Sequence, residues 1–217
     1  MTNYLLSIDP SIKNTGFTLW KPVCKHNKSW NEECNVLIDK ECLPNTAIPV
    51  LILSYDFNKY QHYDFIEKII EQLSIKASED DSHYKWSKYR YWVEDFVVVI
   101  ERGFNNKLNA RSIEKLQSLR GHIFSLLYQY YIPEKHGILP KQWQNWYLKE
   151  YKDDLIKLLK IELKTDMTYI TVKWSKELSI LLCNFLIKQN NWNITISNHD
   201  ETDSLLIGWY YLNKENK

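Results

Sequence analysis

The sequence predicts a mixed α/β fold in which helices cover a single sheet. Two segments, YLLSID (4–9) and DFVVVIE (95–101), have the length and the unbroken apolar character of buried strands. Most of the chain after the second segment carries apolar residues at helical spacing. Strands that come first and helices that come last favour a sheet covered by helices.

Three further segments complete the predicted sheet. GFTLWK (16–21) alternates apolar and polar residues after a short polar loop, so it is predicted to form a hairpin with the first strand. VLILSYDF (50–57) has the composition of a third strand, and KHGIL (135–139) is expected to form a short last strand. The predicted sheet therefore has five strands.

Helical spacing of apolar residues marks the remaining elements. The predicted helices cover residues 63–75, 112–132, 141–163, 174–189 and 199–212. Gly121 lies inside the second helix, where glycine costs about 1 kcal/mol relative to alanine, so we expect close packing there. The apolar side of that helix consists of Ile113, Leu116, Leu119 or Arg120, Ile123 and Leu127.

The composition fits one domain over residues 1–217, because 44% of the residues are hydrophobic and no Gly/Ser-rich or Pro-rich linker divides the chain. The formal net charge is only +1, which excludes a basic surface over the whole chain. Any surface for nucleic acid must therefore be a local patch. Basic residues gather just after the middle of the chain, and these are Lys107, Arg111, Lys115 and Arg120.

The cysteines predict reduced thiols in a reducing compartment. The four are Cys24, Cys34, Cys42 and Cys183, with no CxxC pair among them. A zinc site formed by Cys24, His26, Cys34 and Cys42 is the alternative. No signal peptide opens the sequence, and no apolar run reaches the roughly 18–20 residues that cross a bilayer. We therefore expect a soluble intracellular protein with no membrane partner.

Each of the two most apolar strands is predicted to end in a carboxylate, Asp9 in the first and Glu101 in the second. Ligand-binding residues of α/β proteins gather at strand ends, so both side chains are candidates for a site. For Asp9 an ordinary explanation also exists, because Asp-Pro is a frequent turn signal.

The last predicted helix supplies two more carboxylates. Asn198 can cap this helix, and Glu201 would complete a pair similar to a capping box. Asp200 and Asp203 are three residues apart and share one face of the first turn. Acidic residues are also favoured at helix N-termini by the helix dipole, which is the alternative explanation for both.

These four carboxylates, brought together without a counter-charge, would raise one another's pKa and destabilise the fold. Divalent cations would neutralise them, and oxygen ligands without paired Cys or His select hard ions such as Mg²⁺ or Mn²⁺. Two such ions about 4 Å apart can hold an attacking water and a departing oxygen on opposite sides of a phosphate. The acidic residues thus predict phosphodiester hydrolysis.

Four stretches together resemble the RuvC-type Holliday-junction resolvases of the ribonuclease-H-like superfamily. They are LLSIDPSIKNTGFTLW, VVVIERGFNN, SIEKLQSLRGHIFSLL and HDETDSLLIGWYY, in this order along the chain. The resemblance implies a ribonuclease-H-like mixed five-stranded sheet flanked by helices. It also implies a homodimer that cuts branched DNA, especially four-way junctions, by paired nicks. Each active site would use two Mg²⁺ ions, with Mn²⁺ as a substitute.

The resemblance assigns roles to residues by position. The catalytic, metal-binding carboxylates would be Asp9, Glu101, Asp200 and Asp203. Phe104 matches an aromatic residue near the crossover of the junction, although simple packing would also explain it. Basic DNA contacts would come from Lys107, Arg111, Lys141, Lys173 and Lys176. His199 adjoins the acidic pair and could assist the metal or the water there, although a capping or surface role is the simpler explanation.

The chain also departs from the family pattern. Extra sequence lies near 22–48, 76–92 and 147–172, and Gln144 stands where a lysine often occurs, so Lys141 could take its place. These departures indicate a viral, phage or otherwise divergent member, and hence the cytoplasm of a bacterial or phage-infected cell.

Three other functions remain open from the sequence. The protein could cut several branched DNAs, such as Y-junctions or flaps, without preferring four-way junctions. An actin-like ATPase shares the opening strand, aspartate, loop and strand, but it needs glycine-rich phosphate loops, and the chain has only 5 glycines. A catalytically silent DNA-binding module would not need four acids.

Overall fold

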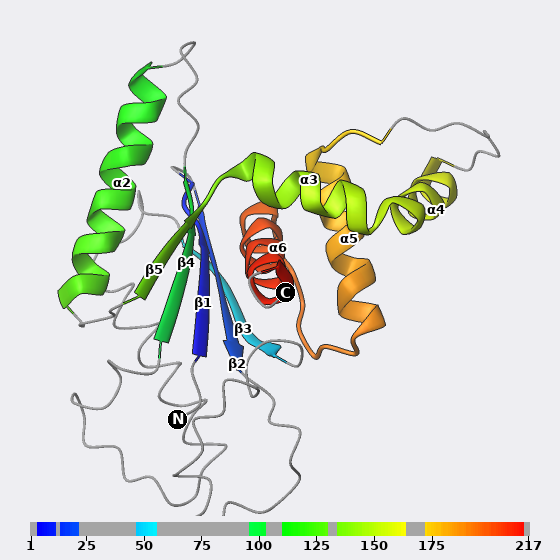
Figure 1. The fold of residues 1–217 in the computed structure, drawn as a ribbon, viewed down its shortest axis with the longest axis horizontal. Coiled ribbons are helices and arrows are strands. Elements are labelled where there is room, and N and C mark those ends of the chain that lie inside the picture. Colours follow the sequence, from blue (N-terminus) through cyan, green and yellow to red (C-terminus); the bar gives the residue numbers. More distant parts are fainter. Residues whose placement is uncertain are drawn as a thin grey trace, which may run out of the picture.

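The structure is a computed structural model that describes residues 4–11, 14–21, 47–55, 96–102, 110–129, 134–163 and 172–214. The strands are β1 (Tyr4–Asp9), β2 (Thr15–Lys21), β3 (Ile48–Tyr55), β4 (Phe96–Glu101) and β5 (Glu134–Ile138). The helices are α2 (Ala110–Gln129), α3 (Pro140–Glu150), α4 (Lys152–Leu163), α5 (Lys176–Gln189) and α6 (His199–Lys214). The sheet lies between α2 and α6, and α3, α4 and α5 lie beyond α6 (Figure 1).

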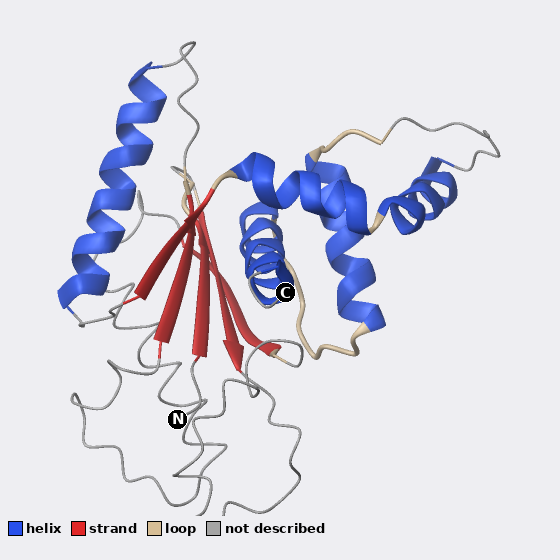
Figure 2. Cartoon of the chain, viewed as in Figure 1, coloured by secondary structure: helices blue, strands red, loops and turns tan. Residues whose placement is uncertain are grey.

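The five strands form one sheet in the order β3-β2-β1-β4-β5. β2 pairs antiparallel with β1 and with β3, as the hairpin prediction requires. β4 pairs in parallel with β1 and with β5. This mixed sheet flanked by helices confirms the predicted fold class (Figure 2).

Side chains of the central strands alternate between the two faces of the sheet. Leu6 and Ile8 of β1 belong to a core cluster that includes Ile123 of α2. Leu5 belongs to the other cluster, which includes Leu206 of α6. Alternate residues of β1 therefore face α6, and the residues between them face α2.

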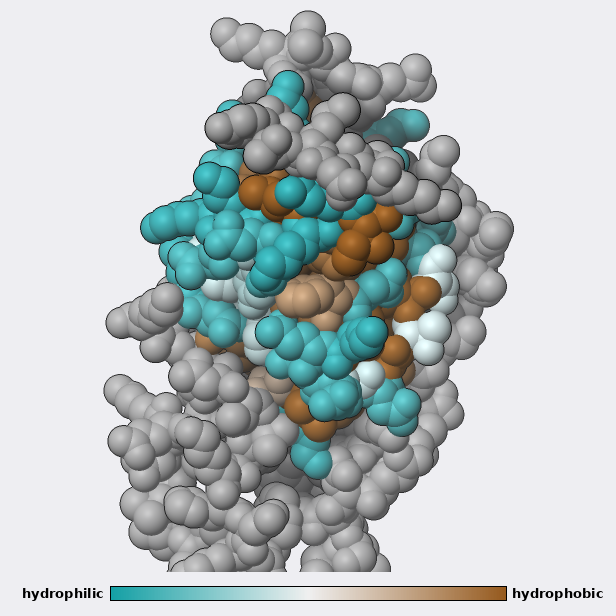
Figure 3. Space-filling model, turned by 90° about the vertical axis from the view of Figure 1, so that its right-hand side faces the viewer, coloured by the Kyte–Doolittle hydropathy of each residue, from teal (hydrophilic) through white to brown (hydrophobic). Residues whose placement is uncertain are grey.

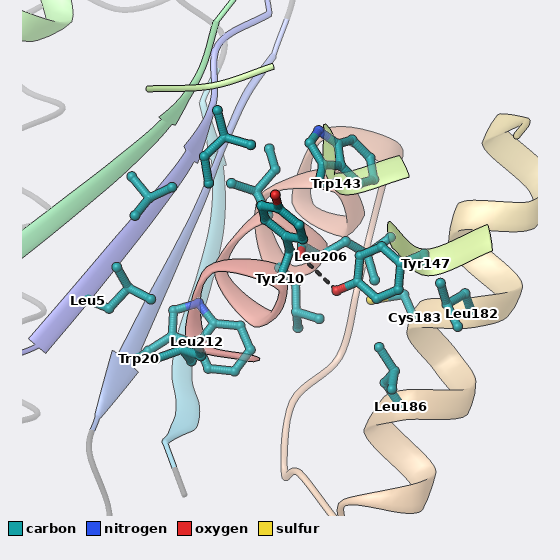
Figure 4. Packing of buried hydrophobic residues seen from close by; sticks show 14 of the residues in the cluster. Leu5, Trp20, Trp143, Tyr147, Leu182, Cys183, Leu186, Leu206, Tyr210 and Leu212 are labelled. Atoms are coloured by element: carbon teal, nitrogen blue, oxygen red, sulfur yellow. Dashed lines mark hydrogen bonds between the residues drawn. The ribbon is translucent and has the colours of Figure 1, made fainter. Parts of the chain in front are cut away.

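The larger core lies between the sheet, α6, α3 and α5 (Figure 4). Trp143 and Tyr147 of α3 are fully buried in it. The Tyr147 hydroxyl donates a hydrogen bond to the backbone oxygen of Leu206, at 2.7 Å. Buried aromatic residues commonly satisfy their polar atom in this way. The bond joins α3 to α6, so α3 is a fixed part of the layer that covers the sheet.

α3 and α4 are separate helices, so the prediction of one helix over 141–163 is wrong. Tyr151 between them has φ −110° and ψ 22°, which are not α-helical values. Its phenol oxygen accepts a hydrogen bond from Trp209 Nε1 at 3.0 Å. Asp153 and Asp154 in the first turn of α4 favour a new helix N-terminus. The helix therefore ends at a tertiary contact, and acidic residues that favour a new N-terminus follow at once, although the apolar spacing continues.

Several predictions fall outside the described residues. These are the helix 63–75, the insertion 76–92, part of 147–172, and nearly all of the insertion 22–48 with its three cysteines. Cys183 is a buried thiol that forms no disulfide. In the described part of the chain, no helix combines the length and the apolar character needed to cross a membrane.

The side of the molecule that carries α4 is mainly hydrophilic, and hydrophobic side chains occur there in separate groups (Figure 3). Among the described residues, the large hydrophobic side chains that are exposed are Ile48, Leu139 and Ile161. They lie on β3, at the β5–α3 connection and on α4. They therefore do not mark one partner surface.

Helix α6 approaches the sheet closely at two glycines. A β-carbon on Gly16 of β2 would meet the backbone carbonyl of Asp200. One on Gly208 of α6 would meet Trp20 Nε1 and Ser7 Oγ. Glycine at these two positions lets α6 lie directly on β1 and β2.

Gly121 of α2 has no such role in the described part of the chain. The residue is exposed, and among the described residues no atom outside its chain neighbours and the backbone of its own helix lies within 4 Å of the place where its β-carbon would be. The prediction of close packing at Gly121 is therefore wrong among these residues.

Gly121→Ala and Gly208→Ala make the same change in two helices and are expected to act in opposite directions. Alanine at Gly121 raises the free energy of unfolding by about 0.5–1 kcal/mol, because it favours the helix and meets no neighbour. Alanine at Gly208 lowers it by about 1–3 kcal/mol, because the hydrogen-bonded Trp20 and Ser7 must move. Urea unfolding followed by circular dichroism measures both values. Equal stabilisation by the two changes would contradict the close approach of α6.

Candidate acidic active site

The parallel register of β1 and β4 brings Asp9 and Glu101 to the same place. Ile8 pairs with Ile100 in this register, and the two carboxylates are the next residues of their strands. Because Ile8 and Ile100 belong to the core under α2, the alternation of side chains turns Asp9 and Glu101 toward α6. The two strand-ending carboxylates therefore meet at one edge of the sheet, on one face.

The first turn of α6 adds two carboxylates and is well capped. The Asn198 side chain accepts a hydrogen bond from the backbone N–H of Glu201 at 3.0 Å. Glu201 Oε2 accepts one from the backbone N–H of Ser197 at 2.6 Å. The predicted cap is thus present, with the glutamate reaching back one residue further than a standard capping box. It fixes the turn that carries Asp200 and Asp203.

Gly16 determines where this turn lies. Gly16 pairs with Asp9 across β1 and β2, and its missing side chain leaves room for the backbone at Asp200. The start of α6 consequently lies over the end of β1, beside Asp9.

Burial raises the pKa of four carboxylates, Asp9, Glu101, Asp200 and Asp203, which we call the acidic cluster, and repulsion by other members adds to this rise for Asp9, Glu101 and Asp203. The pKa of Asp9 lies well above its usual value, first because of burial and then because of the other three carboxylates. Burial is also the main cause for Glu101 and Asp203, whose pKa values rise to about 7. Asp200 is half-buried, and burial raises its pKa as well. Near neutral pH the cluster therefore holds protons unless another positive charge replaces them.

Hydrogen-bond donors act against this repulsion. Trp143 Nε1 donates a hydrogen bond to Glu101 Oε2 at 2.9 Å, and this bond lowers the pKa of Glu101. Ser179 acts in the same direction on the pKa of Asp203. Each donor comes from a helix beyond α6, so the outer helices contribute directly to the site.

Two basic side chains offset part of the negative charge. Arg120 of α2 lowers the pKa of both strand-ending carboxylates. Lys176, exposed in the first turn of α5, lowers the pKa of both carboxylates of α6. Nε and Nη2 of Arg120 are buried without a hydrogen-bond partner. The arginine therefore acts on the cluster through its charge.

Sequence reasoning did not include Arg120 or Trp143 in the site. Arg120 shares the apolar side of its helix with Leu119, and a charged residue on an apolar side is the signal that could have identified it. Trp143 carried no local signal. Its position depends on the pairing of Ile138 with Glu101, which only the sheet register reveals.

His199 begins α6, but Asn198 supplies the cap, so a capping role for His199 is wrong. Its Nδ1 atom is buried without a hydrogen-bond partner. His199 lowers the pKa of Asp200 and also that of Glu177 at the start of α5. The imidazole thus lies between the acidic cluster and α5.

The oxygen atoms of the acidic cluster are of the kind that binds hard cations, but they are not arranged around one point as ligands of an ion. Its ligand atoms are carboxylate oxygens, and Oδ1 of Asp203 is buried without a hydrogen-bond partner. Among the described residues, however, no three His, Cys, Asp or Glu side chains are grouped as ligands of one ion. Because like charges repel, a cation is needed to draw the carboxylates together. The residues fit such an ion by chemistry, and their side chains must close around it.

The structure places three of the six predicted DNA-binding side chains. Lys141 on α3, and Lys173 and Lys176 around the start of α5, are exposed. Phe104 and Lys107 lie outside the described residues. Of Arg111 only its place on α2 is described. The DNA-binding role of all six stays a prediction.

No protein-family model matches the chain, and no curated protein matches its sequence. Several solved structures are similar in fold. Thermus thermophilus RuvC in complex with a Holliday junction substrate is 10% identical, and the match covers 96% of this chain and 92% of that chain with a TM-score of 0.44. The yeast mitochondrial Holliday junction resolvase Ydc2 is 15% identical, with 96% and 79% covered and a TM-score of 0.43. The fowlpox virus Holliday junction resolvase is 12% identical, with 96% of both chains covered and a TM-score of 0.36.

These structures are RuvC and two other Holliday junction resolvases. At these identities and TM-scores, the function has to be argued from the acidic cluster itself.

The stability of the metal-free protein is expected to fall as the pH rises from about 4.5 to about 7. The pKa of Glu101 rises from 4.5 to about 7 on folding, so the folded state binds the proton more tightly in this window. As this carboxyl loses its proton, the free energy of unfolding falls by about 3 kcal/mol. Urea unfolding with a chelator present, at about pH 5 and about pH 8, measures the difference.

Glu101→Gln should reduce this pH dependence by the share of Glu101, because its neutral side chain cannot titrate, while Asp9 and Asp203 still contribute. Glu114→Gln, which changes an exposed residue of α2, is the matched control and should leave the dependence as it is. An equal pH dependence in wild-type protein and Glu101→Gln would show that the buried carboxyl does not govern stability in this window.

Proposed function

We propose that the chain is a metal-dependent, structure-specific DNA endonuclease that resolves four-way junctions by paired nicks. The observation that carries this proposal is the acidic cluster, in which four carboxylates from three distant elements converge at strand ends and repel one another. A fold that merely needs stability does not retain buried like charges, because each costs free energy. A cluster of this kind is useful when hard cations occupy it.

Two hard divalent ions, when bound, would activate a water molecule and stabilise the departing oxygen of a phosphodiester. Asp9 is the carboxylate whose pKa all three others raise, and it would hold both ions. Glu101 and Asp203 would each hold one ion, and Asp200 would complete a ligand set or orient the water. Both Mg²⁺ and Mn²⁺ are hard ions that prefer oxygen ligands of this kind.

Basic side chains near the cluster would bind the DNA backbone. Lys173 and Lys176 are exposed near the start of α5, and Lys176 acts on the carboxylates of α6. A phosphate held there would lie next to the acidic cluster. The affinity for DNA should then fall steeply with salt, because cations released from the DNA favour binding less at high salt.

Paired nicks require two active sites, and the described part of one chain contains one acidic cluster. We therefore infer a homodimer that acts on both strands of a junction. We also infer one domain over 1–217, with insertions near 22–48, 76–92 and 147–172. The cytoplasm of a bacterial or phage-infected cell remains the expected compartment.

Cleavage of a set of DNA substrates tests the proposal. Purified protein is incubated with four-way, three-way, flap and linear duplex DNA, with Mg²⁺, with Mn²⁺ and with a chelator, and the cut ends are mapped. We expect symmetric nicks in the four-way junction that need a divalent ion. Equal cutting of flaps and Y-junctions would favour a broader branched-DNA nuclease. ATP hydrolysis without DNA cleavage would overturn the proposal.

Asp9→Asn is expected to reduce junction cleavage by at least about 10³-fold, equivalent to roughly 4 kcal/mol, because it removes the carboxylate on which all three others act. Junction binding measured by gel shift should persist, since the change removes negative charge. Asp153→Asn on α4 alters an exposed carboxylate and should cleave as the wild type does. Loss of binding together with cleavage would mean that Asp9 is needed for folding rather than for chemistry.

A further inference from the structure

The indole of Trp143 lies against the acidic cluster and is bonded to one of its members. Its Nε1–H donates to Glu101 Oε2 at 2.9 Å, and the residue is fully buried. The chain path explains this position. β5 pairs in parallel with β4 so that Ile138 lies opposite Glu101, and α3 begins at Pro140. The short connection therefore carries Trp143, in the first turn of α3, to the end of β4.

Neighbouring rings hold the indole in its orientation. Trp143 makes edge contacts with Trp174, at 4.9 Å between ring centroids, and with Tyr147, at 6.3 Å. Tyr147 is in turn bonded to the backbone of Leu206 in α6. Figure 4 shows Trp143 and Tyr147 in the core beside α6. Packing on several sides prevents rotation of the ring, so the direction of its N–H does not depend on the carboxylate.

We propose that Trp143 is a positioning residue that holds the carboxyl group of Glu101 ready to bind a divalent cation. This inference rests on the metal-binding part of the proposed function. The hydrogen bond engages Oε2 and leaves Oε1 as the oxygen that can face an ion. Because the bond comes from a fully buried ring, it also limits rotation of the Glu101 carboxyl group.

The alternative is that the bond only satisfies a buried indole N–H, as buried tryptophans require. The two explanations differ in what they predict for metal binding. Groups that orient a metal ligand typically contribute 10–100-fold to metal affinity or activity. A bond that serves the indole alone contributes nothing to the affinity for an ion.

Two replacements of Trp143 remove the donor. Trp143→Phe removes the N–H and part of the ring, and replacement by benzothienylalanine removes the N–H while keeping the shape of the indole. Trp146→Phe is the matched control, because Trp146 lies on the same helix and contacts Tyr147 and Tyr210. Mn²⁺ binding without DNA is measured by electron paramagnetic resonance of the free ion. The Mg²⁺ concentration for half-maximal cleavage is measured in parallel.

Both replacements of Trp143 are expected to weaken Mn²⁺ binding by about 10–100-fold. The Mg²⁺ concentration for half-maximal cleavage should rise by a similar factor, and the rate at saturating Mg²⁺ should approach that of the wild type. Trp146→Phe should bind Mn²⁺ as the wild type does. This difference between affinity and maximal rate is not expected from a general loss of packing.

Wild-type affinity in the benzothienylalanine protein would overturn the inference, even if Trp143→Phe fails to fold. Equal weakening by Trp146→Phe would also overturn it, because packing would then be the cause. Protein that binds Mn²⁺ and shows these effects but cuts no DNA would support the inference and overturn the proposed nuclease. Wild-type protein that binds no divalent ion would overturn both.

Discussion

Parallel pairing of β1 with β4 is the constraint on which the acidic site depends. Side chains alternate along a strand, so a slip of one residue would turn Asp9 or Glu101 into the core under α2. Ser7 opposes that slip, because its buried hydroxyl is hydrogen-bonded to Trp20 Nε1 and to the backbone oxygen of Thr18 on the face that carries α6, and a slip would turn it into the apolar core under α2. The register that keeps these hydrogen bonds is therefore the register that brings the two carboxylates together.

The acidic cluster destabilises the fold that holds it, and the surrounding layers must compensate. Burial raises the pKa of each member, which means that each ionised carboxyl costs free energy in the folded state. α6 is held against this repulsion by its Asn198 cap, by close contact with the sheet at Gly208, and by the bond from Tyr147. None of these contacts involves a carboxylate of the cluster. Different residues of α6 thus stabilise the helix and form the site, as is common where an active site lowers the stability of the fold.

Local signals explain what the sequence could predict. The strands ending at Asp9 and Glu101 are short apolar runs, and the start of α6 has its cap and acids within a few residues. What could not be predicted depends on tertiary neighbours. Trp143 meets Glu101 only because β5 pairs with β4, and the helix break at Tyr151 involves Trp209, 58 residues away in the chain. No spacing within either segment contains that information.

Charge determines how metal and DNA binding must be related at this site. The acidic cluster holds four carboxylates, and the basic side chains that act on them in the described residues are Arg120 and Lys176, with His199 also acting on Asp200. With all four carboxyls ionised, the positive charges of Arg120 and Lys176 leave an excess of negative charge. A DNA phosphate adds another negative charge, so bare carboxylates repel the group that they are proposed to act on. Bound divalent cations make the net charge of the site positive, so that it attracts the phosphate. The cations must then raise the affinity for DNA by the same factor by which DNA raises the affinity for the cations.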